Sequence, residues 1–259
     1  MSALYTFDGS AYLPGPLCVG PWSPDAQHGG PVSALLAGAV ESAVDPRFES
    51  VPVQTVRVTV ELLRPVPLSP LTLSSAVVRP GRNVQLVEAT MHSGEVEVAR
   101  ARGLRIRRSS MDVPVERAAP PAPVPSSEPT DSSVARRTAF AEAVDLRFVK
   151  GSWDEAGPVI MWSRLLVPVV EGFEPSPLQR ATAAADFGNG VSRVLEFDHH
   201  TFINPDLTVA LCRVPDGEWI GFDVVSRLST DGFGQAESAI FDPFGPVGRS
   251  VQSLLVSER

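Results

Sequence analysis

The feature that most constrains the fold is a succession of elements that occurs twice along the chain. In the first copy a helix rich in small residues precedes four strands, predicted at residues 31–43, 53–62, 71–78, 84–91 and 95–106. The second copy repeats this succession at residues 177–187, 201–213, 218–228, 233–241 and 248–256. An offset of 149 residues places Thr59 over Thr208 and Arg100 over Arg249. The repeat predicts two similar domains, each with one helix and an antiparallel meander.

The strands are indicated by alternating apolar and polar residues. In the first long strand Val58 and Val60 occupy one face, whereas Arg57 and Thr59 occupy the other. Turn signals at residues 80–83 (PGRN) and 93–94 (SG) separate the strands that follow. Further strands are predicted outside the repeat, at residues 4–7, 144–149 and 158–167.

The helix of the second copy has sequence signals at both ends. Ser176 is a favourable N-cap, Pro177 fits the first helical position, and Gln179 can complete a capping box. Gly188 and Gly190 are predicted to end the helix. Its middle consists of Ala and Thr, which predicts a thin rod held closely by a surrounding sheet.

Asp186 is a candidate functional residue because it lies in the last turn of this helix. The helix dipole is negative at that end and disfavours a carboxylate by a few tenths to about 1 kcal/mol. An unfavourably placed charge suggests a functional role. A solvated aspartate near a helix end is the alternative interpretation.

The helix of the first copy is preceded by His28, Gly29 and Gly30. The glycines leave backbone N–H groups open to an oxygen or a phosphate, and His28 beside them is a candidate substrate contact. Arg79 and Arg82 flank a turn and are candidate contacts for an anionic ligand. The alternatives are a glycine helix start without a ligand and two solvated arginines.

A proline-rich segment separates the two copies. Residues 109–137 contain many prolines among Ala, Ser and Glu, a composition typical of an extended linker that does not pack. We therefore predict an N-terminal domain over residues 1–108, a linker over 109–137 and a C-terminal domain over 138–259.

The composition argues against several classes of protein. A formal net charge of −8 and a pI near 5.1 oppose nucleic-acid binding, which requires clustered Lys and Arg. No apolar run approaches the roughly 18 to 20 residues of a membrane span, and no signal-peptide pattern is present, so we expect a cytoplasmic protein. Cys18 and Cys212 are far apart and lack metal-ligand spacing, which predicts reduced thiols and no metal site.

Several motifs together resemble one protein family. They are WSPDAQHGGP at residues 22–31, VTVELLRPV at 58–66, RPGRNVQL at 79–86, ADFGNGVS at 185–192, and NPDLTV with GEW within 202–219. In order and spacing they resemble the acyl-CoA thioesterase II (TesB-like) branch of the thioesterase superfamily. The resemblance implies an α+β double hotdog fold, in which two antiparallel sheets each wrap around a small-residue helix.

The resemblance also implies a hydrolytic site. In this family an aspartate at the end of the second helix, a hydroxyl residue at the start of the next long strand and a glutamine on the last strand activate a water. These positions correspond to Asp186, Asn204 and Gln252, and Asn204 departs from the usual threonine. Asp186 would be the base, while the two amides would hold the water and Gly29-Gly30 would stabilise the oxyanion. An acyl-CoA substrate, no cofactor and a homodimer are implied as well.

Two other functions remain open. Asn204 at the hydroxyl position suggests a non-catalytic protein that binds acyl thioesters. Residues 197–200 (FDHH), followed by Asn204, suggest an enoyl-CoA hydratase instead. A serine nucleophile is not indicated, because Ser33 and Ser192 lack a GxSxG elbow.

Overall fold

The computed structural model describes residues 3–112, 119–121, 123–125, 132 and 134–259. The helices are α1 (Gly29–Ser42), α2 (Pro177–Ala185) and α3 (Gly188–Val191), with the 3-10 helices η1 (Pro16–Cys18), η2 (Pro46–Phe48), η3 (Ala135–Arg137) and η4 (Ala139–Ala143). The strands of the first half are β1 (Tyr5–Phe7), β2 (Tyr12–Pro14), β3 (Val53–Leu62), β4 (Thr72–Arg79), β5 (Val84–Ser93) and β6 (Val96–Arg107). Those of the second half are β7 (Val144–Lys150), β8 (Val159–Leu165), β9 (His200–Ile203), β10 (Asp206–Leu211), β11 (Ile220–Leu228), β12 (Phe233–Asp242) and β13 (Gly245–Glu258).

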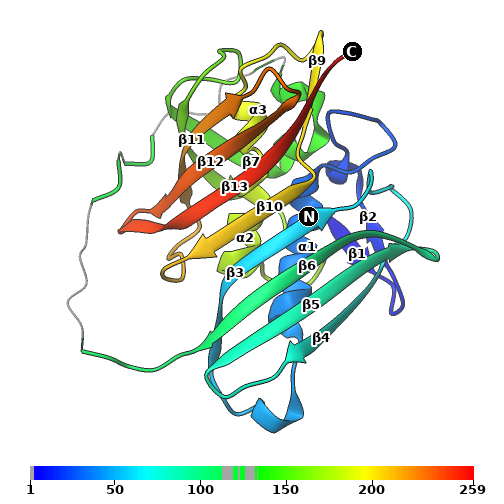
Figure 1. Cartoon of the computed structure of the whole chain (residues 1–259), viewed down its shortest axis with the longest axis vertical. Helices are drawn as coiled ribbons and strands as arrows, with labels where there is room; N and C mark the ends of the chain where they lie inside the picture. Colours follow the sequence, from blue (N-terminus) through cyan, green and yellow to red (C-terminus); the bar gives the residue numbers. More distant parts are fainter. Residues whose placement is uncertain (1–2, 113–118, 122, 126–131, 133) are drawn as a thin grey trace.

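Within the described residues, one antiparallel sheet of 11 strands extends through both halves (Figure 1). Its strand order is β4-β5-β6-β3-β10-β13-β12-β11-β8-β7, and β9 pairs with β13. Strands β1 and β2 form a separate two-stranded sheet. Each copy of the repeat therefore contributes one half-sheet, and the two half-sheets are joined edge to edge through β3 and β10.

The pairing register confirms the internal repeat. Thr59 and Thr208 lie directly opposite each other on β3 and β10, with their hydroxyl oxygens 3.0 Å apart. In the first half Leu62 pairs with Ala99, and the residues 149 positions later pair with each other in the second half. The two halves are therefore related by an approximate two-fold axis between Thr59 and Thr208.

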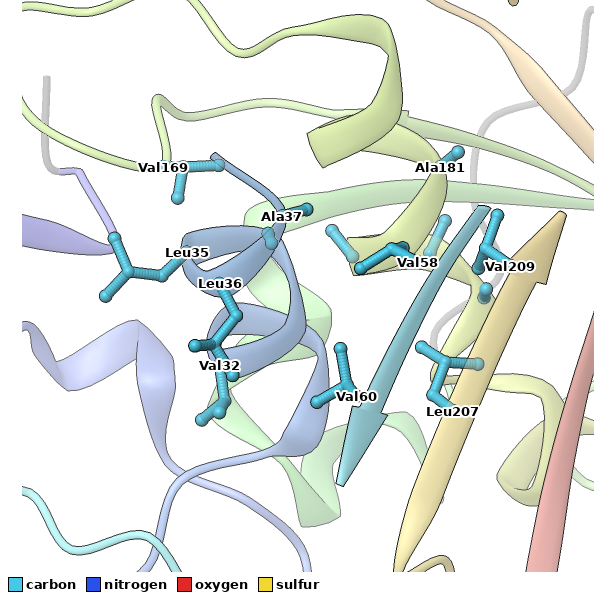
Figure 2. Packing of buried hydrophobic residues seen from close by; sticks show 14 of the residues in the cluster. Val32, Leu35, Leu36, Ala37, Val58, Val60, Val169, Ala181, Leu207 and Val209 are labelled. Carbon is cyan, nitrogen blue, oxygen red and sulfur yellow. The ribbon is translucent and has the colours of Figure 1, made fainter. Parts of the chain in front are cut away.

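Helices α1 and α2 pack against each other in opposite directions, on the same face of the sheet (Figure 1). Val58 and Val60 of β3 are fully buried beneath them (Figure 2). Burying such a side chain contributes about 1.5–3 kcal/mol. The helices approach closely because their residues are small: a Cβ atom at Gly38 would lie 2.5 Å from Gln179 Nε2. This antiparallel arrangement brings the end of α2 to the start of α1.

The start of α2 is as predicted, but its end is not. Ser176 and Gln179 form the capping box. Asp186 is the C-cap in a right-handed conformation (φ −71°, ψ −15°), and α3 follows at once instead of a left-handed glycine. Gly188 is required for a different reason, since a Cβ atom there would lie 2.8 Å from Gln252 Oε1.

The single strand predicted over residues 201–213 is divided into β9 and β10. Pro205 lies between them and has no N–H to donate to a neighbouring strand. Its carbonyl accepts a hydrogen bond of 2.7 Å from the N–H of Leu62 instead. The interruption places Asn204 outside the regular ladder, with its side chain directed at the end of α2.

The linker predicted over residues 109–137 lies partly outside the described residues, at 113–118, 122, 126–131 and 133. Its last part packs against the second half, contrary to the expectation from composition. Ser132 is buried and donates to Asp154 Oδ1 at 2.8 Å, and Ala135–Arg137 form η3.

Among the described residues, no helix is both long and apolar enough to cross a membrane.

Candidate active site

A cavity of about 400 Å³ lies where the end of α2 meets the start of α1. Its lining is mostly apolar and comes from both halves. The large apolar residues in it include Trp22, Leu62, Trp153, Phe187, Phe197, Ile203 and Leu255. Its polar residues include His28, Arg64, Arg137, Asp186 and Asn204. A largely apolar cavity with a few convergent polar groups is typical of a small-molecule site.

Asp186 is the centre of the polar groups. Its side chain is buried, and its Oδ1 atom accepts hydrogen bonds from Asn204 Nδ2 at 2.8 Å and from Gln252 Nε2 at 3.3 Å. The Oδ2 atom lies 2.9 Å from His28 Nδ1. The structure therefore brings together Asp186, Asn204 and Gln252, although they are far apart in the sequence, and adds His28 to them.

The position of Asp186 at the negative end of α2 is balanced by the start of α1. A Cβ atom at Gly29 would lie 2.6 Å from Asp186 Oδ2 and 2.8 Å from Oδ1, so the carboxylate sits directly against the first residue of α1. The N-terminal end of a helix carries positive partial charge and stabilises an anion. Gly29 permits this contact because it has no side chain.

The two amides reach Asp186 from different strands. Gln252 lies on β13, and its Oε1 atom accepts a hydrogen bond of 3.2 Å from the backbone N–H of Asn189, which directs Nε2 towards the carboxylate. Asn204 donates through Nδ2 both to Asp186 and to the carbonyl of Asp206. The amide nitrogen of Asn204 thus donates to the Asp186 carboxylate, which leaves the amide oxygen of Asn204 able to accept a hydrogen bond from a water.

His28 is the N-cap of α1, where its Nδ1 atom accepts a hydrogen bond of 3.0 Å from the N–H of Gly30. Its ring packs against Phe140 and Phe187, with both centroid distances 5.0 Å. Gly30 is buried, and of the two glycines considered for an oxyanion site only Gly29 lines the cavity.

Arg79 and Arg82 do not line the cavity as described. Arg79 ends β4, and Arg82 lies in the turn to β5, at the end of the sheet where Gln85 pairs with Arg105. Arg105 donates to the carbonyl of Ala43, the C-cap of α1. The cavity lies at the opposite end of this 14-residue helix, which spans about 21 Å. Their role as ligand contacts therefore remains a prediction from sequence.

Asp198, His199 and His200, which suggested a hydratase, also lie outside the described cavity lining. Asp198 is exposed and accepts a hydrogen bond of 2.7 Å from Arg137. His199 and His200 therefore do not belong to the described lining of the cavity around Asp186.

The approximate two-fold axis relates this site to the other end of the helix pair, which carries different residues. Thr55 and Gly103 occupy the positions 149 residues before Asn204 and Gln252. There the buried Arg105 donates to the carbonyl of Ala43. Burial raises the pKa of the nearby Glu41 carboxyl, although a hydrogen bond from Ser176 partly offsets this rise. Although the fold is duplicated, the carboxylate with its two amide donors therefore lies at the end of the helix pair that contains Asp186, and the other end carries different residues.

Several cavity residues were not identified from sequence, among them Trp153, Phe187, Arg64 and Arg137. Trp153 and Phe187 form an edge-to-face pair with centroids 5.8 Å apart. The sequence places Arg64 at the end of a long strand and within the VTVELLRPV motif, but no ligand role was predicted for it. Its position directly after a long strand at the seam of the two halves is the signal that could have identified it.

The fold and the site define this chain as a double hotdog protein with a buried carboxylate where the end of α2 meets the start of α1. The model of the acyl-CoA thioesterase N-terminal domain matches residues 19–106, and that of the acyl-CoA thioesterase C-terminal domain matches residues 116–256. The chain therefore belongs to the acyl-CoA thioesterase family with these two domains.

Solved structures show the same fold at low sequence identity. A hot dog fold protein from Alicyclobacillus acidocaldarius has a TM-score of 0.74 and 16% identity, with 98% of this chain and 95% of that chain covered. An acyl-CoA thioesterase II from Mycobacterium marinum has a TM-score of 0.64 and 18% identity, with 90% of each chain covered. The tesB protein of Mycobacterium avium subspecies paratuberculosis has a TM-score of 0.65 and 16% identity, with coverages of 98% and 95%. No curated protein sequence matches this chain.

Proposed function

We propose that this protein hydrolyses acyl-CoA thioesters by a water molecule that Asp186 deprotonates. The observation that carries the proposal is the buried Asp186 carboxylate with two amide donors on Oδ1, at the wall of a mostly apolar cavity. The family to which the chain belongs supports the same reaction. A panel of acyl-CoA esters of increasing chain length, assayed for release of free thiol, tests the proposal.

In this reaction the water oxygen forms a bond to the thioester carbonyl carbon as its proton passes to Asp186. A positioned carboxylate of this kind contributes about 10²- to 10⁴-fold to the rate. The oxygen of Asn204 would hold the water in line with the carbonyl carbon. Gly29, at the positive end of α1, would stabilise the oxyanion. The C–S bond then breaks, and the sulfur leaves with a proton as the free thiol.

The character of the cavity suggests how it would hold an acyl-CoA. Its apolar lining suits the acyl chain and the pantetheine arm. Arg64 is exposed at the cavity, and within the described residues its guanidinium has no ion-pair partner. An unpaired guanidinium is well suited to a phosphate group. We therefore assign Arg64 to the phosphate-bearing end of CoA.

Changing Arg64→Ala should lower kcat/KM for an acyl-CoA by about 10- to 150-fold, because a hydrogen bond to a charged group contributes about 1.5–3 kcal/mol. The same acyl group on pantetheine, which lacks the phosphates, should be hydrolysed by the variant at the wild-type rate. Steady-state kinetics with both esters checks this. An equal loss on both esters would show that Arg64 does not contact the phosphates.

Asn204 tests whether an amide can replace the family's usual hydroxyl. Asn204→Thr should keep kcat within about tenfold of wild type, because a hydroxyl can donate to Asp186 and accept from water. Asn204→Ala removes both functions and should lower kcat by about 10- to 100-fold. Kinetics on one acyl-CoA suffice, and full activity in the alanine variant would remove Asn204 from the mechanism.

A further inference from the structure

His28 Nδ1 lies within hydrogen-bond distance of two groups, one of which is a donor and the other an acceptor. The N–H of Gly30, 3.0 Å away, requires a lone pair on Nδ1. The Oδ2 atom of Asp186, 2.9 Å away, requires a proton between the two atoms. A ring nitrogen can donate or accept a hydrogen bond, but it cannot do both at once.

One proton can therefore occupy either of two positions, on Asp186 Oδ2 or on His28 Nδ1. With the proton on Asp186 Oδ2, the carboxyl group donates to Nδ1, and Nδ1 still lies against the helix N–H. With the proton on Nδ1, His28 donates to the carboxylate and releases the N–H of Gly30. The loss of the N-cap bond is unfavourable, and a charge-assisted bond to a buried carboxylate offsets it. A proton can therefore cross between Asp186 and His28 along a contact that already exists.

The second ring nitrogen faces a different environment. His28 lines the cavity, and its Nε2 atom has no hydrogen-bond partner in the part of the chain that the structure describes. Stacked Phe140 and Phe187, with ring centroids 5.0 Å apart, hold the imidazole in place. The ring therefore connects Asp186 to the cavity.

We infer that His28 carries a proton from Asp186 to the sulfur of the leaving thiol, an inference that rests on the proposed hydrolase function. Asp186 takes the proton of the attacking water and passes it from Oδ2 to Nδ1. As the C–S bond breaks, Nε2 gives its own proton to the sulfur, so that the thiol leaves neutral. The ionising carboxylic acid product then returns a proton to Nε2, and Nδ1 loses its proton through Asp186 to water.

The apolar lining of the cavity explains why proton transfer to the leaving sulfur would be needed. A thiolate released without a proton would be an uncompensated charge among Trp153, Phe187 and Leu62, where burial of a charge is costly. A thiol whose anion is intrinsically stable, such as 2-nitro-5-mercaptobenzoate, does not need the proton. The contribution of His28 should therefore depend on the leaving group.

The test separates this role from that of a helix cap. Asparagine is among the best N-cap residues, so His28→Asn should keep the cap on Gly30 while it removes the proton carrier. We expect kcat for an acyl-CoA to fall about 10²-fold in this variant, and kcat for the acyl ester of 2-nitro-5-mercaptobenzoate to fall less than about fivefold. His28→Ser, which also caps a helix, should behave in the same way, and circular dichroism checks that both variants fold.

Full activity of a folded His28→Asn protein on acyl-CoA would overturn the inference, as would equal losses on the two esters. Asp186→Asn serves as the matched control, since it should lower hydrolysis of both esters by about 10³-fold. If Asp186→Asn is fully active, the proposed hydrolase mechanism itself fails, and this result is distinct from a failure of the His28 step alone.

Discussion

Asp186→Asn should lower kcat/KM for the preferred acyl-CoA by about 10³-fold, because an amide cannot accept the proton of the attacking water. The substitution keeps the shape of the side chain, and its oxygen can still accept the bonds that Asn204 and Gln252 donate to Oδ1. Steady-state thiol release measures the loss. Acyl-CoA binding, measured by calorimetry, should change far less than the rate.

The matched control for this substitution is Asp223→Asn, at an exposed position on β11. Its kcat/KM should equal that of wild type, since the change removes an exposed carboxylate that does not belong to the described cavity lining. An Asp186→Asn protein that folds normally and keeps its full rate would exclude Asp186 as the base.

Gly29→Ala should have the second-largest effect, with a loss in kcat of about 10²-fold or more. The new methyl group would lie 2.6 Å from Asp186 Oδ2, a separation that no real Cβ contact tolerates. The carboxylate must therefore move, and a displacement of about 1 Å at a reacting group costs about 10²-fold. Kinetics of thiol release, together with a thermal melt to confirm folding, measure the effect.

Gly38→Ala makes the same change in the same helix, about 13 Å farther along. Its methyl group would meet the flexible end of the Gln179 side chain, not the carboxylate. This control should cost some stability but leave kcat close to wild type. Equal kcat losses in the two glycine variants would mean that packing of α1, and not the position of Asp186, determines the rate.

The repeat and its succession of elements were readable from sequence because both rest on local periodicity, whereas the double hotdog fold was implied by the family resemblance. The offset of 149 residues appears in the alternation of the strands and in the order of the turns, and it is the offset that pairs Thr59 with Thr208 across the seam. Two departures from the predicted elements, the end of α2 and the break between β9 and β10, coincide with tertiary contacts, although Pro205 is also a local signal for the break. Gly188 makes room for Gln252, and Asn204 leaves the ladder to reach Asp186.

The site was only partly predictable. Asp186 could be identified from its own helix, because a carboxylate in the last turn is disfavoured by the helix dipole. Asn204 and Gln252 were identified only through a family resemblance. The contact of Asp186 with the start of α1 depends on the antiparallel packing of two helices from separate halves. The sequence of either helix alone does not indicate that packing. A homodimer likewise remains a prediction from resemblance.

The most direct test of the account is a single turnover of an acyl-CoA by excess wild-type protein in water enriched in oxygen-18. Direct attack by a water that Asp186 deprotonates predicts release of free thiol, one labelled oxygen in the carboxylate product and no label in Asp186. Tight binding of acyl-CoA without thiol release would identify a binding protein instead, and label in the Asp186 carboxyl group would show attack by the carboxylate itself.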